Sequence, residues 1–185
     1  MNRRKILLSL FIAAVARPSP VLCASSAAER IEVGGATLDF FIDPGEFELG
    51  RAALLDWVTR SAGAVSAYFG RFPVPRARVH IIISQGSRVS SGTSFGDHGA
   101  RCKISVGRNT SLSDLFADWE LTHEMVHFGF PSVADRHHWI EEGIATYVEP
   151  IARASVGILT AEQVWAKCCG ICRKVFRSRA ARLSV

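Results

Sequence analysis

Two histidines four residues apart are the residues of this chain best suited to chemistry: His123 and His127, in the segment His-Glu-Met-Val-His. Residues four apart in a helix differ by only about 40° around its axis, so the two imidazoles lie one above the other and can bind a single Zn²⁺. Glu124 then lies beside the metal, where a carboxylate can take a proton from a zinc-bound water and pass it to a leaving amine. The segment therefore predicts a zinc hydrolase. The simpler interpretation is an amphipathic helix that bears two surface or core histidines.

A catalytic zinc needs a third protein ligand and one coordination position left open for water. Glu142 follows His127 by fifteen residues, which is enough chain for a helix end, a turn and a second helix that starts near residue 138. Glu141 competes for the same role. We favour Glu142 because the residues expected on its helix face are small, with Ala145 one turn further on, and would let the first helix approach.

Helical spacing predicts which faces this second helix presents. The core face is expected to hold Ile140, Ile144, Tyr147 and Val148, and the neighbouring face Glu142, Ala145, Thr146 and Glu149. His137 and His138 lie just before the helix; either could bind a metal, but we expect polar residues at the rim of the site. Asp118 and Glu120 could orient the ligand histidines, although solvated helix carboxylates are the simpler expectation.

Taken together, His123-Glu-Met-Val-His127 and Trp139-Ile-Glu-Glu-Gly-Ile-Ala-Thr-Tyr147 resemble the gluzincin metallopeptidases, particularly the gluzincin aminopeptidases. The resemblance covers about residues 119 to 150. It implies a zincin-like domain in which His123, His127 and Glu142 bind zinc, Glu124 is the general base and Thr146 supports a ligand. The metzincin pattern is excluded, because Phe130 and Val133 occupy its glycine and histidine positions. No Gly-x-Met-Glu-Asn motif precedes the zinc helix, so aminopeptidase specificity is not implied.

The rest of the chain supplies the elements that must position these residues, and it predicts an α+β domain with a small mixed or antiparallel sheet. Hydrophobic periodicity and turn residues predict a hairpin around Gly34-Gly35, a long helix within 47–69, a buried strand at 77–84, a loop at 85–100, a short strand at 102–106 and the zinc helix at 114–128. We expect residues 101–106 to form the strand edge that binds a peptide substrate by adding it as a further strand. His98 in the preceding loop could reach the cleft, but a solvated loop histidine is the simpler expectation.

Charge is distributed unevenly along the chain. The net charge is +5, yet residues 1–27 carry four basic residues and residues 165–185 carry six, with no acid in either segment; residues 28–164 therefore hold 12 basic and 17 acidic residues, a net of −5. This balance gives no support for a nucleic-acid partner. The expected partner is a peptide or protein substrate.

The first residues have the features of an export signal. Arg3, Arg4 and Lys5 precede an apolar stretch from 6 to 16 that is too short to cross a bilayer, and small residues follow. We therefore predict a signal peptide at 1–27, a zincin-like domain at 28–164 and a periplasmic or secreted protein without a stable transmembrane anchor.

Residues 165–185 form an atypical basic tail that contains three cysteines, Cys168, Cys169 and Cys172. With Cys102 they would permit two disulfides, but their clustering does not resemble a disulfide framework, and no function is expected of the C-x-x-C pair. Gluzincins continue into a helical segment that supplies a tyrosine or histidine to the oxyanion. A truncated or frame-altered C-terminus is therefore expected.

The sequence as a whole predicts an exported zinc metallopeptidase. The alternative is a catalytically inactive, zinc-stabilised binding module of the cell envelope, which would bind the same ion but would hydrolyse nothing.

Overall fold

A computed structural model describes residues 21–23, 29–96 and 99–170. Most of the predicted signal peptide, His98 and the tail from residue 171 onward, including Cys172, lie outside these residues. The last described residues of the predicted signal, Val21–Cys23, form strand β1, which pairs with β4 (Gly45–Phe47) in a separate two-stranded sheet.

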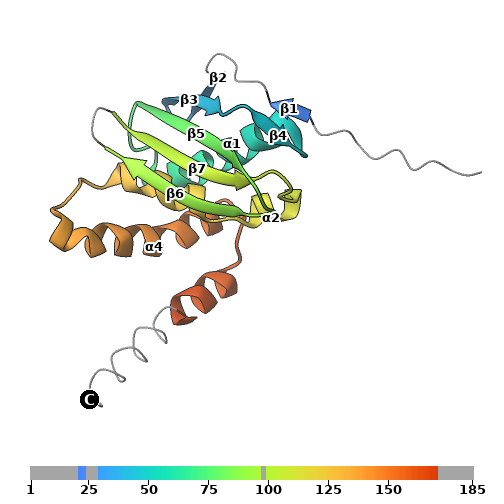
Figure 1. Ribbon diagram of the computed structural model, residues 1–185. Coiled ribbons are helices and arrows are strands. Elements are labelled where there is room, and N and C mark those ends of the chain that lie inside the picture. Colours follow the sequence, from blue (N-terminus) through green and yellow to red (C-terminus); the bar gives the residue numbers. More distant parts are fainter. Residues whose placement is uncertain (1–20, 24–28, 97–98, 171–185) are drawn as a thin grey trace, which may run out of the picture.

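The main sheet has five strands in the order β2-β3-β5-β7-β6 (Figure 1). Its strands are β2 (Glu29–Val33), β3 (Ala36–Ile42), β5 (Arg76–Ser84), β6 (Val89–Phe95) and β7 (Arg101–Gly107). The three central strands β3, β5 and β7 run parallel, while β2 and β6 pair antiparallel at the two edges. The predicted α+β class and small mixed sheet are confirmed.

The hairpin of β2 and β3 follows directly from its sequence. Gly34 and Gly35 form the turn with φ values of +56° and +78°, a backbone region that L side chains rarely adopt. A Cβ at Gly34 would also lie 2.1 Å from Ser66 Oγ, so the turn can pack on the neighbouring helix only without a side chain. Along β3, every second residue is buried, which gives the sheet one core face.

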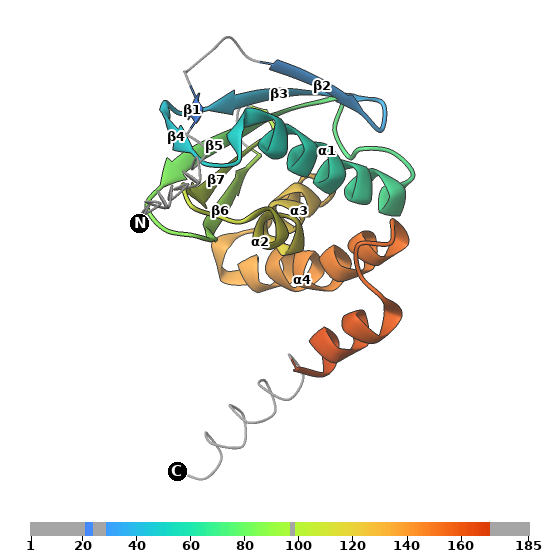
Figure 2. The ribbon, with the colours of Figure 1, turned by 90° about the vertical axis from the view of Figure 1, so that its right-hand side faces the viewer.

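The labelled helices all lie on one side of the sheet (Figure 2). Helix α1 (Gly50–Phe69) ends at Gly70 in the left-handed conformation. Its buried residues recur at spacings of three and four: Leu54, Trp57, Val58, Ser61, Ala62 and Val65. It packs against α3 (Glu120–Val126) and α4 (His138–Ser155), which also contact each other. These helices and the sheet enclose one continuous hydrophobic core.

The predicted loop at 85–100 is the main error in the expected fold, because residues 89–95 form the edge strand β6. Consequently the strand at 101–107, expected at the edge, is internal and lies between β5 and β6. The segment was predicted as a loop because most of its residues are small and polar. They are tolerated there because β6 pairs along its length with the apolar strand β7, which supplies the burial that β6 itself lacks.

The predicted single helix at 114–128 is divided. Helix α2 (Leu112–Ala117) begins at Ser111, whose hydroxyl accepts a hydrogen bond from the Asp114 N–H. Asp118 then adopts an extended conformation, and its carboxylate accepts the N–H of Glu120, the first residue of α3. A 3₁₀ turn, His127–Gly129, continues α3 before the chain leaves at Phe130.

The expected core face of α4 is correct at Val148 and Ile144 and wrong at Tyr147. Tyr147 is 60% exposed, and the buried positions are Ala145, Val148, Glu149, Pro150, Ala152 and Arg153. The face expected to carry Glu142 is partly buried and holds an ion pair. Arg153 Nη1 lies 2.8 Å from Glu149 Oε1, and Arg153 Nη2 donates to the Ala117 carbonyl. This pair joins α4 to the end of α2. Residues 161–170 form a further helix beyond α4.

In the parts of the chain that the structure describes, no helix combines the length and the hydropathy needed to span a bilayer. Cys102 is buried in the sheet with a free thiol, and burial raises its pKa well above the usual range. Cys168 and Cys169 are also free thiols. No disulfide therefore joins Cys102, Cys168 and Cys169.

Candidate metal centre

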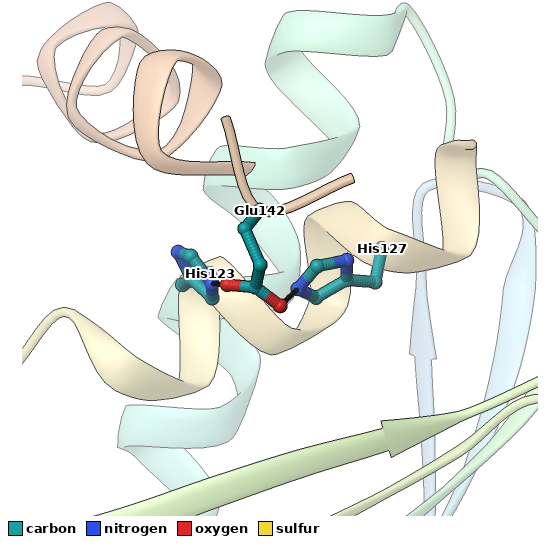
Figure 3. Close-up of side chains that lie close together, drawn as sticks. All are labelled: His123, His127 and Glu142. Carbon is teal, nitrogen blue, oxygen red and sulfur yellow. Dashed lines mark hydrogen bonds and ion pairs between the residues drawn. The ribbon is translucent and has the colours of Figure 1, made fainter. Parts of the chain in front are cut away.

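Three of the predicted site residues converge in space. His123 and His127 project from successive turns of the α3 segment, and Glu142 reaches between them from α4 (Figure 3). His123 Nε2 lies 3.2 Å from Glu142 Oε2, and His127 Nε2 lies 3.4 Å from Glu142 Oε1. The three potential ligand atoms lie within 4.8 Å of one another, and in the described residues no other His, Cys, Asp or Glu group of this kind occurs.

The donor set of two imidazoles and one carboxylate suits a divalent metal ion. Two ligand atoms bound to zinc at about 2.0 to 2.2 Å in tetrahedral geometry lie roughly 3.4 Å apart. The separations of 3.2 and 3.4 Å between the imidazoles and the carboxylate match that spacing. Two imidazole nitrogens and one carboxylate are also the donor set of a catalytic zinc site, which keeps one position open.

The environment keeps the second histidine in the form that binds metal. Burial lowers the pKa of His127, and the neighbouring His123 imidazole lowers it further. A neutral ring at neutral pH leaves a nitrogen lone pair free for an ion. His123 is 5% exposed, so both rings are held in protein and only Glu142 is substantially open to solvent.

The two neighbouring glutamates have different roles. Glu141 accepts a short hydrogen bond from the Val133 backbone N–H, so its carboxylate holds the turn that precedes α4. Glu142 points to the histidines instead. The choice of Glu142 over Glu141 therefore agrees with the geometry.

The two histidines at the start of α4 are both exposed. His137 accepts a hydrogen bond from Arg136 and does not join the metal group. His138 Nε2, in contrast, lies 3.1 Å from Glu142 Oε1, on the solvent side of the site. It can donate a hydrogen bond to the Glu142 carboxylate and orient it. His138 was expected only at the rim of the site, so this direct contact was not predicted.

Glu124 lies beside the ligands rather than among them. Its side chain is 7% exposed, and burial raises its pKa, an effect that the hydrogen bond from Ser94 partly offsets. The Ser94 hydroxyl lies 2.6 Å from both Glu124 Oε2 and the Glu124 backbone carbonyl oxygen. A carboxyl group with a raised pKa is the stronger proton acceptor, as a general base requires.

A cavity of about 590 Å³ opens beside these groups. One wall is the edge strand β6 with its continuation to Gly96, another is the segment from His127 to Ser132, and the third is the start of α4. Glu124, His127 and Glu142 all face the cavity. An extended segment lying along β6 would therefore pass Glu124, His127 and Glu142. The strand predicted for this role, 101–106, lies one strand further in.

Other predicted supporting residues do not contact the ligands. Thr146 is half-buried one turn after Glu142, and within the described residues it makes no hydrogen bond to the three ligand groups. Asp118 and Glu120 bind backbone N–H groups instead. His123 Nδ1 is buried with no hydrogen-bond partner among the described residues, and the ring packs edge-on against Trp119. Ligand histidines usually have such a partner.

Sequence reasoning missed the contribution of β6. Ser94 holds Glu124, and Gly92 leaves room for it, since a Cβ at Gly92 would lie 2.6 Å from Glu124 Cγ. The sequence signal for this contact was weak: β6 is a run of small residues, and α3 carries Glu120 and Glu124.

Comparison with known proteins adds no assignment to this geometry: no protein-family model matches the chain, and no significant match is found among curated proteins.

Proposed function

We propose that this protein is an exported zinc metallopeptidase of the gluzincin type, with a zincin-like fold, that hydrolyses peptide bonds. The observation that carries the proposal is the convergence of His123, His127 and Glu142 beside a buried Glu124 on the wall of a cavity. The mixed sheet supports it, because its edge strand runs antiparallel to its neighbour and borders that cavity. The basic start and short apolar stretch at 1–16 support export.

The proposed metal site consists of His123, His127 and Glu142. Zinc bound there would polarise the scissile carbonyl and acidify a water molecule. Glu124 would take the proton of that water on its carboxylate and deliver it to the departing amine nitrogen. Ser94 would hold the Glu124 carboxylate through its hydroxyl, and His138 would hold the Glu142 carboxylate from the solvent side.

The substrate would lie in the cavity against β6. Backbone groups at the open edge of a strand can bind the backbone of an extended peptide, whatever its side chains. The lining includes Phe95, Phe128 and Phe130, which offer apolar contact to a substrate side chain. The proposal therefore specifies an extended peptide segment.

The test replaces Glu124 with Gln and compares the variant with the wild-type chain. Both are loaded with zinc, and cleavage of a mixed peptide library is followed by mass spectrometry. We expect cleavage by the wild-type chain and a loss of about 10²- to 10⁴-fold in E124Q, with zinc content unchanged in E124Q because Glu124 is not a ligand. Zinc binding without any cleavage by the wild-type chain would instead indicate the inactive binding module.

A further inference from the structure

The open edge of β6 is not uniformly available to a substrate. The Gly92 N–H donates to Glu120 Oε1 at 2.8 Å, so it points away from β7. Backbone groups in an antiparallel ladder alternate between the partner strand and the open side. Gly92 and Ser94 therefore direct their N–H and C=O groups to the open edge, whereas Thr93 between them pairs with Lys103 of β7.

Both edge-facing groups of Gly92 already have partners. Glu120 takes the N–H, and the Thr93 hydroxyl donates to the Gly92 carbonyl at 2.7 Å. Among the residues that the structure describes, no hydrogen bond reaches the edge-facing N–H or C=O of Ser94, and the Ser94 side chain is occupied by Glu124. The edge is thus open at Ser94 and closed at Gly92.

We infer that Glu120 is a specificity-determining residue that closes one end of the substrate-binding edge, and this inference rests on the proposed function. A peptide paired with Ser94 would next meet the edge about two residues further along, at Gly92. There its carbonyl oxygen would face the Glu120 carboxylate instead of a free N–H. The protein would therefore take peptides that end close to this point on the Glu120 side.

The position of Glu120 supports this role. Asp118 fixes its backbone by accepting the Glu120 N–H at 2.9 Å, so Glu120 stands in the first turn of α3 and cannot easily withdraw. A hydrogen bond to a carboxylate is stronger than one to a peptide carbonyl, so a substrate would not readily displace it. The cavity has the same asymmetry: it extends from Gly92 toward Gly96 and Ser132, and neither Trp119 nor Glu120 lines it.

Two series of peptides with one shared cleavable core test the inference. One series is lengthened residue by residue at the amino end and the other at the carboxyl end, and kcat/KM is measured for each with the zinc-loaded chain. We expect that lengthening one end by about three residues lowers kcat/KM roughly tenfold, the equivalent of one lost backbone hydrogen bond. Lengthening the other end should have little effect.

Variants of Glu120 test whether this residue causes the limit on peptide length. E120A frees the Gly92 N–H and should raise the ratio of long-peptide to short-peptide kcat/KM about tenfold. E120Q keeps an amide oxygen that can accept the same N–H and should keep the wild-type ratio. Thr93 is exposed, so T93V provides a second variant that should fold: it frees the Gly92 carbonyl and should shift the ratio in the same direction, while T93S should not.

The outcomes separate this inference from the proposed function. A wild-type chain that cleaves peptides with equal tolerance at both ends, or an unchanged ratio in E120A and T93V, overturns the role of Glu120 and leaves the metallopeptidase intact. A zinc-loaded wild-type chain that cleaves no peptide overturns both.

Discussion

The adjacent glutamates Glu141 and Glu142 at the start of α4 have different partners. The turn before α4 leaves the Val133 N–H without a helical partner, and Glu141 satisfies it. Glu142, one residue on, is rotated about 100° around the helix axis and reaches the histidines. Each glutamate thus has its own partner: Glu141 the Val133 N–H, and Glu142 the two histidines.

Ser94 should matter for catalysis through Glu124. We predict that S94A lowers kcat about tenfold with little change in KM, because the Glu124 carboxylate loses the hydroxyl that positions it. S94T keeps a hydroxyl and should recover most of the activity, although its added methyl must be accommodated. Steady-state kinetics on one peptide checks this, and an S94A enzyme with wild-type kcat would show that Glu124 needs no such support.

Asp118 should make stability depend on pH. Burial raises its pKa from 3.8 to about 6, so between these values the folded chain holds a proton that the unfolded chain has released. The protonated carboxyl group favours the folded chain at low pH, and this contribution is lost as pH rises through about 6. Above that pH the buried charge lowers the free energy of unfolding.

We therefore predict that D118N, which is neutral at every pH, is more stable than the wild-type chain at pH 7 by on the order of 1 kcal/mol and loses this advantage near pH 4. Urea denaturation at both pH values measures the difference. A less stable D118N at pH 7 would mean that the charged cap on Glu120 outweighs the burial of Asp118.

The grouping of His123, His127 and Glu142 was predictable, because two of these residues share one helical path and the third lies one helix further along the chain. His123, Glu124 and His127 need only a continuous helical path, and α3 with its 3₁₀ extension provides one. The contacts of Ser94 with Glu124 and of Glu120 with Gly92 were not predictable, since both depend on β6 lying beside α3. The sequence contains no local signal for that contact.

At the scale of elements, β6 was missed because its stability comes from β7. An edge strand of small polar residues has weak intrinsic preference, and pairing with a buried neighbour decides its structure. The helix predicted at 114–128 is divided for a local reason. The Asp118 carboxylate accepts the Glu120 N–H and so competes with the hydrogen bonds of a continuous helix. On α4, Val148 is buried as predicted and Tyr147 is not, and the buried Arg153–Glu149 pair was missed because hydrophobic patterning excludes charged residues from the core.

Close packing of β6 on α3 leads to a prediction about glycine. A methyl group at Gly92 would lie 2.6 Å from Glu124 Cγ and 2.9 Å from its Oε1, so G92A should displace the proposed base and the strand. We expect a loss of about 1 to 3 kcal/mol in stability and a fall in kcat that exceeds tenfold.

Gly63 offers the matched control. It lies in the middle of α1 with open space where a Cβ would be, so G63A should raise the free energy of unfolding by about 0.5 to 1 kcal/mol and leave kcat unchanged. Thermal denaturation and peptide hydrolysis of both variants provide the comparison. Wild-type activity in G92A would contradict the tight contact between β6 and Glu124.

Across the whole molecule, one sheet face and the helices enclose a hydrophobic core that does not include the proposed ligands. The chain therefore has a source of stability that does not depend on a metal, as expected for a catalytic rather than a structural zinc site. The ligands lie at the open end of α4, beside the cavity, where an ion and a substrate can both enter. This placement supports the proposal that the protein is an enzyme.

The central claim is that one zinc ion binds to His123, His127 and Glu142, and a zinc titration of the metal-free chain tests it most directly. We predict one zinc per wild-type chain, an affinity lower by at least about 100-fold in H127A and E142A, and unchanged binding in a C168S/C169S control that removes the described tail thiols. Zinc binding that survives in E142A, or a wild-type chain that binds none, would contradict the account.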